Sequence, residues 1–254
     1  MRSRTFLIFA LALPWTLTAC TAPHRTDAQS TSSSSISSAP SQPSSPSSSI
    51  SSQPSSAPNV ASLDTIGPLD VPFTVQAPFA VWDALHEETC EEAVLLMLVH
   101  YEEKRPFTPQ IAEDELQELV AWETKNGYGV DIGMAEMAKI AQEKYGLHAS
   151  ARMNVTADTI KRALLTGHPV IIPAAGRDLG NPYFSGAGPW YHAIVVTGYK
   201  KGWFGESFIV NDPGTKRGKS YEYPVEKLLS AVHDWTGVKE EIRTGPRAML
   251  VVEN

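Results

Sequence analysis

The chain has 254 residues, of which 42% are hydrophobic and 19% are charged, and its formal net charge at pH 7 is −7. Lysine and arginine are scattered without forming a basic patch, which argues against nucleic acid or an anionic membrane surface as an electrostatic partner. Cys20 and Cys90 are the two cysteines of the chain.

The first twenty residues have the pattern of an export signal. Two arginines precede an apolar run over residues 6–13, which is too short to span a bilayer comfortably. The sequence Leu17-Thr18-Ala19-Cys20 then resembles a bacterial lipobox. This resemblance implies cleavage after residue 19 and attachment of a diacylglycerol to the sulfur of Cys20, and several acyl chains would hold the protein stably on a membrane. We therefore expect residues 1–19 to be a lipoprotein signal peptide, and the mature protein to be extracytoplasmic and membrane-anchored.

A serine- and proline-rich segment follows the predicted anchor. More than half of residues 30–56 are serine, and almost no apolar side chain is available for burial. Such a segment cannot offset its chain entropy, so residues 20–66 are predicted to be a disordered tether. The composition changes at about Ile66, and residues 67–254 are long enough for one domain with a sizeable core. The sequence contains no internal repeat and no second membrane segment.

Helix signals come first in this domain. Thr89 and Glu92 have the spacing of a capping box, which predicts a helix that begins at Cys90. Three further helices are indicated by cap residues and by terminal glycines: Thr108-Pro109 to about Lys125, Asp131 to Gly146, and Thr156 to Gly167.

Strand signals follow the helices. Apolar, β-branched segments occur at 169–174, 191–199, 207–211 and 248–252, with a weaker one at 219–223. This segregation predicts an α+β domain in which N-terminal helices pack on a mainly antiparallel sheet.

Cys90 becomes the single thiol of the mature protein once Cys20 is lipidated, so no internal disulfide can form. At the first position of a helix, the backbone N–H groups and the helix dipole favour a thiolate. Four glutamates between residues 87 and 92 oppose it, although glutamates at a helix start also commonly stabilise the dipole. Cys90 therefore needs a cationic partner to react, and to be alkylated quickly, at neutral pH.

His192 is the best candidate for that partner. It opens an apolar segment, and the next segment ends in Asn211-Asp212. If the two segments form a hairpin with its turn near Gly202, His192 falls opposite Asp212 on the same face, where the carboxylate would orient the imidazole. A bulge that shifts the register by one residue would place Asn211 there instead.

These residues resemble the papain-like cysteine peptidases, and within them the stand-alone relatives of the double-glycine leader peptidases of bacteriocin exporters (cysteine peptidase family thirty-nine). The resemblance covers nearly all of residues 71–254. It rests on the cysteine that opens a helix and on four segments: Val71-Pro72-Phe73-Thr74-Val75-Gln76, Gly167-His168-Pro169-Val170-Ile171-Ile172, Tyr191-His192-Ala193-Ile194-Val195-Val196-Thr197-Gly198-Tyr199 and Val210-Asn211-Asp212-Pro213-Gly214.

The resemblance implies a papain-like fold and a role for each matching residue. Cys90 would be the nucleophile, His192 the general base and then acid, Asp212 the orienting group, and Gln76 an oxyanion donor beside the Cys90 backbone N–H. The chain departs from the exporter peptidases in the glutamates that follow Cys90 and in the long spacing from Gln76 to Cys90. No transporter is attached, so processing of leader peptides during export is not expected.

The sequence thus leads to the hypothesis of a lipid-anchored, monomeric cysteine peptidase that cleaves peptide or isopeptide bonds of a peptide or protein substrate, without a cofactor. An acyl or amide transferase with the same residues, and a non-catalytic binding lipoprotein that keeps the fold, are the alternatives. His86 and Cys90 alone do not make a zinc site. The aromatic residues Trp82, Trp190, Tyr191, Trp203 and Trp235 are expected mainly in core and rim packing, with Trp190 and Tyr191 at the edge of the cleft.

Overall fold

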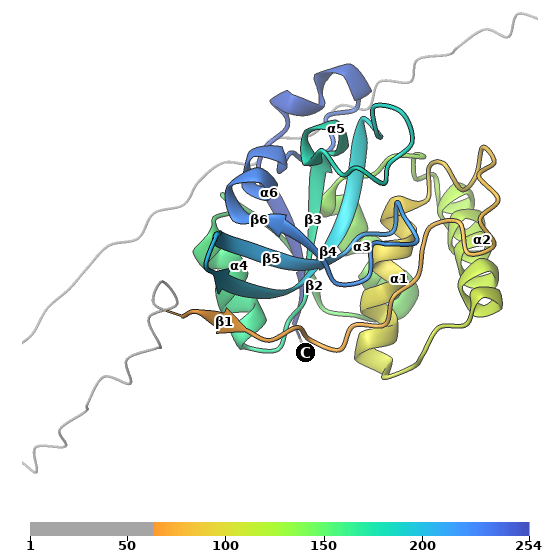
Figure 1. The fold of residues 1–254 in the computed structure, drawn as a ribbon. Coiled ribbons are helices and arrows are strands. Elements are labelled where there is room, and N and C mark those ends of the chain that lie inside the picture. Colours follow the sequence, from red (N-terminus) through yellow and green to blue (C-terminus); the bar gives the residue numbers. More distant parts are fainter. Residues whose placement is uncertain (1–62, 254) are drawn as a thin grey trace, which may run out of the picture. The chain divides into compact units, whose positions relative to one another are not determined.

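Seven strands form one sheet in the computed structural model, which describes residues 63–253 (Figure 1). The order is β2-β7-β3-β4-β5-β6, and β1 pairs separately with β4. Every pairing is antiparallel. The strands are β1 (Thr65–Ile66), β2 (Ala149–Met153), β3 (Val170–Ala175), β4 (Tyr191–Gly202), β5 (Gly205–Asn211), β6 (Tyr221–Pro224) and β7 (Ala248–Val252). The expected signal peptide, Cys20 and most of the predicted tether lie outside the described residues. The predicted end of the tether at residue 66 is wrong, because Thr65–Ile66 pairs with β4 and Ile66 is buried.

The helices begin and end close to the predicted positions. They are α1 (Cys90–Glu103), α2 (Pro109–Asn126), α3 (Met134–Tyr145), α4 (Ala157–Leu165), α5 (Gly176–Leu179) and α6 (Val225–Ala231), with a 3₁₀ helix, η2 (Lys239–Thr244). The predicted cap at Asp131 is wrong, because α3 starts after Gly133. The N–H of Met134 donates instead to Asp234 Oδ1, at 3.0 Å, so a distant segment supplies the acceptor that this helix start requires.

Helices cover both faces of the sheet. Apolar side chains of α1, α2 and α3 pack against one face, where Ile171, Val195 and Leu250 point. The helices α4 and α6 pack against the other face, which carries Ile172 and Val196 among others. The α+β, papain-like architecture predicted from the sequence is confirmed, and the helices α1–α3 lie together to the right of the sheet in Figure 1. The central strands are buried on both sides, which is why they read as continuous apolar runs.

The β4–β5 hairpin has a different register from the predicted one. Its turn is Trp203-Phe204, between the paired residues Gly202 and Gly205, and a bulge interrupts the ladder between Val196 and Gly198. The predicted alignment of His192 with Asp212 is therefore wrong, and Asn211, the alternative, lies opposite Val195. The turn falls later than the Gly202 centre assumed, which shifts the pairing, and the bulge in β4 between Val196 and Gly198 offsets only part of that shift. Asp212 consequently lies just beyond the paired part of β5.

The loop after β5 folds tightly around Asp212. The Asp212 N–H donates to the Gly218 carbonyl at 3.0 Å, and a Cβ atom on Gly218 would lie 1.8 Å from the Asp212 carbonyl oxygen. No side chain fits this close approach of two backbone segments. Gly218 therefore fixes the position of the residue that precedes the loop.

We expect Gly218→Ala to destabilise the protein by roughly 1–3 kcal/mol, because the backbone must move to admit the methyl group. Thermal unfolding measures the effect. Gly67→Ala is the control, since a Cβ there would meet nothing within 4 Å, and it should change stability by less than about 0.5 kcal/mol. Equal stabilities of the two variants would contradict the close approach.

Candidate active site

Cys90 is the first residue of α1, as predicted, and its side chain is 6% exposed. The predicted capping box is wrong, because Thr89 makes no side-chain cap. The Thr89 hydroxyl donates instead to the Gln76 carbonyl, at 3.2 Å, and Glu92 turns into the interior. The helix start is thus held by the segment before it, which brings Gln76 beside Cys90.

His192 and Asp212 form a buried pair despite the altered register. His192 Nε2 lies 2.7 Å from Asp212 Oδ1, and the two side chains are 1% and 0% exposed. This contact uses Nε2 and leaves Nδ1 of the ring as the nitrogen available for other contacts. Asp212 reaches the ring from its loop rather than from a position directly opposite in the ladder.

Three further donors surround the Asp212 carboxylate. Tyr223 Oη donates to Oδ2 at 2.7 Å, Asn181 Nδ2 donates to Oδ2 at 3.1 Å, and the Gly214 N–H donates to Oδ1 at 3.0 Å. Burial alone would raise the pKa of Asp212, but the charge of His192 and the hydrogen bonds from His192, Tyr223 and Gly214 outweigh it, and the pKa is lowered. Asp212 is therefore set to remain charged beside the imidazole. Sequence reasoning missed Tyr223 and Asn181, since nothing in their local sequence marks them.

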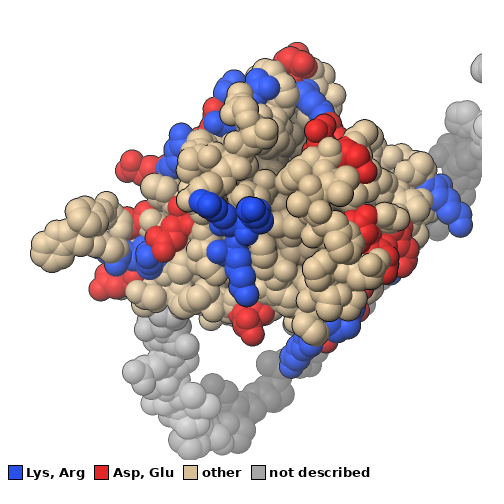
Figure 2. All heavy atoms as spheres, turned by 45° about the vertical axis from the view of Figure 1, so that its right-hand side comes forward, with Lys and Arg blue, Asp and Glu red and all other residues tan. Residues whose placement is uncertain are grey.

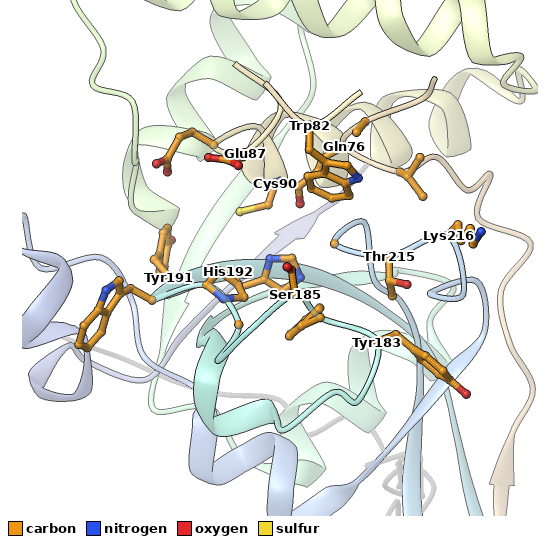
Figure 3. A pocket seen from close by; sticks show the side chains of 18 of the residues that line it. Gln76, Trp82, Glu87, Cys90, Tyr183, Ser185, Tyr191, His192, Thr215 and Lys216 are labelled. Atoms are coloured by element: carbon orange, nitrogen blue, oxygen red, sulfur yellow. The ribbon is translucent and has the colours of Figure 1, made fainter. Parts of the chain in front are cut away.

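Cys90, His192 and Gln76 line one cleft of about 700 Å³, a size typical of ligand sites (Figure 3). In this view Cys90 and Gln76 lie on one wall and His192 lies on the facing wall, at the start of β4. Asp212 lies behind the imidazole and does not line the cleft. The structure thus brings together all four residues that the sequence had singled out.

Gln76 is held firmly in this cleft. Its Nε2 donates to the His86 carbonyl at 2.8 Å, and its backbone N–H donates to the Pro213 carbonyl at 3.0 Å. Because an amide nitrogen carries two hydrogens, one N–H remains for a ligand. The long spacing from Gln76 to Cys90 is taken up by a loop that returns to Gln76 through His86 and Thr89.

The thiol of Cys90 faces a carboxyl group. Cys90 Sγ donates to Glu91 Oε2 at 2.8 Å, and in the part of the chain that the structure describes it makes no hydrogen bond with His192. Burial, followed by the charge of Glu91, raises the pKa of Cys90 well above its usual value, although the Ala193 N–H partly lowers it. The expected thiolate–imidazolium pair is therefore absent from this conformation, which holds a neutral thiol.

Two of the four glutamates near Cys90 are buried, contrary to their reading as dipole-stabilising surface residues. Glu91 and Glu92 are 1% and 4% exposed, and Glu92 faces the carboxyl group of Glu123. Burial raises the pKa of Glu91 to about 8 and that of Glu123 to about 7, and it raises that of Glu92 well above the usual range. Glu91 and Glu92 therefore favour the protonated form at neutral pH, and Glu123 titrates close to neutrality, because burial disfavours the charged carboxylates. By contrast, Glu88 is partly exposed and pairs with Lys239 at 2.8 Å.

The aromatic residues divide between the cleft and other places. Trp82, Trp190 and Tyr191 line the cleft, and Trp235 packs on Tyr191 with ring centroids 5.3 Å apart. Trp203 does not fit the packing expected of it, because it is 96% exposed in the turn between β4 and β5.

The surface charges and the side chains that could bind a metal give no sign of another class of site among the described residues. The face shown in Figure 2 carries a small group of basic side chains at its centre, and acidic and basic side chains alternate along its edges. Within residues 63–253, no group of three or more His, Cys, Asp or Glu side chains is arranged to hold a metal ion. His86, once considered as a ligand, lies between Asp83 and Glu113, at 2.7 and 3.0 Å. None of the helices described has the length and apolar character needed to cross a membrane.

Helices packed on an antiparallel sheet, with a cysteine at a helix start and a strand histidine across one cleft, define the papain-like class. A sequence model described as the Peptidase_C39 like family matches residues 68–241, and the chain belongs to that family. No curated protein matches the chain. The crystal structure of a candidate C39-like peptidase from Bacillus anthracis aligns with 14% identity and a TM-score of 0.48, over 73% of this chain and 95% of that one.

The buried carboxyl groups predict an unusual dependence of stability on pH. The folded state retains protons that the unfolded state releases above the ordinary glutamate pKa of 4.5, so the free energy of unfolding should fall as pH rises from there toward 8. Glu92→Gln removes one such proton. We expect it to raise the melting temperature at pH 8 and to have little effect near pH 5, as measured by thermal unfolding at both values.

Glu240→Gln, at an exposed position, serves as the control for this measurement. It should leave the pH dependence of the melting temperature as it is in the parent. An equal gain from Glu92→Gln at both pH values would show that Glu92 carries no extra proton in the folded state.

Proposed function

We propose that the protein is a cysteine peptidase that hydrolyses peptide or isopeptide bonds through a thioester on Cys90, with His192 and Asp212 as its partners. The observation that carries the proposal is the shared cleft, where the only thiol of residues 63–253 faces a histidine already paired with a buried carboxylate. This arrangement can accept, hold and return a proton during acyl transfer. Membership of the Peptidase_C39 like family supports the same activity.

The proposed reaction begins with transfer of the Cys90 proton to His192. Sγ attacks the substrate carbonyl carbon, and the oxyanion accepts hydrogen bonds from the Cys90 backbone N–H and from the free N–H of Gln76. His192 gives its proton to the leaving nitrogen, the C–N bond breaks, and a thioester remains. Water then attacks the thioester while His192 takes its proton, and the returning proton restores the Cys90 thiol as the acid product leaves.

The Cys90–Glu91 hydrogen bond requires an additional step before this chemistry. The S–H must leave Glu91 Oε2 and turn toward His192, since the imidazole cannot take a proton that is donated elsewhere. Rotation of the Cys90 side chain accomplishes this without moving the helix. We infer that the conformation described is a resting state in which the nucleophile is uncharged.

The same hydrogen bond favours a second candidate function. A protein that binds peptides without cleaving them would lose nothing by keeping its thiol neutral and bonded to a carboxyl group. Such a binding lipoprotein would use the cleft around Trp82, Trp190 and Tyr191 as its ligand site. Cleavage assays separate the two functions.

The location is proposed from the sequence. We propose that Cys20 carries the lipid of a membrane-anchored, extracytoplasmic lipoprotein, that the predicted tether connects it to the domain as far as the start of β1, and that the protein acts as a monomer on peptide or protein substrates. The lipobox-like sequence Leu17-Thr18-Ala19-Cys20 supports the anchor.

Substitution of the four proposed residues should separate their roles. We expect Cys90→Ser and His192→Ala each to reduce cleavage of a peptide mixture by roughly a thousandfold or more. Asp212→Asn should reduce it by roughly a hundredfold or more, because the ring loses its charged partner. Gln76→Ala should reduce it about a hundredfold yet leave the alkylation rate of Cys90 unchanged, since an oxyanion donor acts only on developing charge. New peptide termini are counted by mass spectrometry.

An unaltered rate in Cys90→Ser would contradict the proposed nucleophile. Absence of cleavage by the parent chain in any mixture would favour the binding function instead. Products joined to an added amine would identify a transferase.

Glu91 should govern the reactivity of the resting thiol. Glu91 becomes negatively charged only above its pKa of about 8, which is the range in which the Cys90 thiol would lose its proton. Glu91→Gln removes that charge while keeping the size of the side chain, so the pKa of Cys90 should fall. The alkylation rate below that pKa should rise about tenfold for each unit by which the pKa falls. The measurement is the pH profile of the rate with iodoacetamide. Glu87→Gln, an exposed glutamate of the same cleft that does not contact the sulfur, should leave the profile unmoved.

A further inference from the structure

Trp203 and Phe204 form an exposed pair at the end of the β4–β5 hairpin, here called the aromatic turn. Their side chains are 96% and 102% exposed, more than any other large apolar side chain among the described residues. Gly202 and Gly205 close the ladder behind them, and Gly205 has a φ of 125°, which favours glycine. Neither aromatic ring contributes to the core of the domain, so folding alone does not explain these two residues.

The aromatic turn lies next to the point where the N-terminal segment enters the domain. Thr65 of β1 pairs with Lys200 of β4, and the Lys201 N–H donates to the Asp64 carbonyl at 2.6 Å. The described chain begins at residue 63, and the segment before it leads back to Cys20. β1 and the hairpin accordingly lie on the same side of the sheet in Figure 1. A lipid on Cys20 would therefore be connected to the domain at a point beside the aromatic turn.

The side chains behind the turn suit a membrane interface. Lys201 is exposed and makes no ion pair within residues 63–253, while Lys200 pairs with Glu222 at 2.6 Å. Tryptophan is enriched at the level of the lipid headgroups. The methylene groups of a lysine side chain can pack on apolar surface while its ammonium group stays in water. Along the β4–β5 hairpin the two aromatic residues lie at the tip and the lysines lie behind them. This is the order expected of a segment whose tip enters the bilayer interface.

A second copy of the chain is a poorer occupant for the aromatic turn. An aromatic side chain buries about 150–250 Å² at most, so two of them supply roughly 300–500 Å². A stable protein interface needs about 800 Å² from each partner. Insertion into a bilayer does not require a buried area of that size. A tether raises the local concentration of the aromatic turn at the membrane to about millimolar, at which a weak contact is sufficient.

We propose that the aromatic turn, Trp203-Phe204, inserts into the interface of the phospholipid bilayer that carries the lipid on Cys20. This inference rests on the proposed lipid anchor. It also orients the active site, because His192 and Gly202 lie at opposite ends of β4, at most about 33 Å apart at the usual rise per residue. The cleft is then held away from the lipid, where it meets substrates outside the bilayer.

The test uses the full chain reconstituted in phosphatidylcholine vesicles, with and without lipid that is brominated on its acyl chains. Bromine quenches tryptophan only at short range, so a Trp203 that sits in the bilayer contributes to the quenched emission. Trp203→Phe keeps the apolar ring and removes the indole, and it should reduce the quenched emission at least twofold. Trp82→Phe, at a position 47% exposed in the cleft, is the matched control and should leave the quenched emission unchanged.

Equal quenching in the parent and in Trp203→Phe would overturn the proposal. Sedimentation of the parent as a dimer that Trp203→Ser with Phe204→Ser dissociates would also overturn it, in favour of a second copy. Cys20→Ala tests the anchor separately. If the anchor proposal is wrong, that variant associates with membranes as the parent does, whatever the result for Trp203.

Discussion

The carboxylate of Asp212 is the point on which the site depends. It is completely buried, and four donors from four segments converge on it: His192 of β4, Tyr223 of β6, Asn181 after α5, and the Gly214 N–H. A buried charge is tolerated only when its hydrogen-bonding capacity is met, so any of these segments that moved would leave the carboxylate unsatisfied. The position and orientation of the His192 imidazole are therefore fixed jointly by segments from the second half of the domain.

The two sides of the cleft treat a negative charge differently. The histidine side contains a charge that is stabilised by donors, whereas the cysteine side contains Glu91, Glu92 and Glu123, whose burial raises their pKa values. Burial is the main reason that a thiolate on Cys90 is disfavoured, and Glu91 adds to it, which agrees with the hydrogen bond that the thiol donates to Glu91. In the proposed mechanism, the energy for forming the ion pair would come from His192 and from bound substrate, which would couple the reactivity of Cys90 to occupancy of the cleft.

Local signals predicted the elements well, and long-range contacts account for the errors. The starts of α2 and α4 and the whole of β7 follow from caps, a proline and an apolar run, whereas α1 starts at the predicted residue without the predicted cap. The strand β2 was missed because its sequence, Ala149–Met153, is short and contains no β-branched or aromatic residue. The contact between His192 and Asp212 was predicted from a register that is wrong. The contact forms nonetheless, because Asp212 lies on a loop and reaches the ring from beyond the paired part of β5. Burial of Glu91 could not be predicted, since its partner is the Ile132 N–H, far along the chain.

The strand β4 connects the cleft with the aromatic turn. It begins with the imidazole in the cleft and ends beside the aromatic turn, and its first nine residues are all buried. Halfway along, Gly198 leaves room for the incoming chain, because a Cβ there would lie 3.0 Å from the Ile66 carbonyl. A strand packed on both faces does not bend independently of the domain. The point at which the N-terminal segment enters the domain is thus fixed relative to the cleft, at the end of β4 that lies farthest from His192.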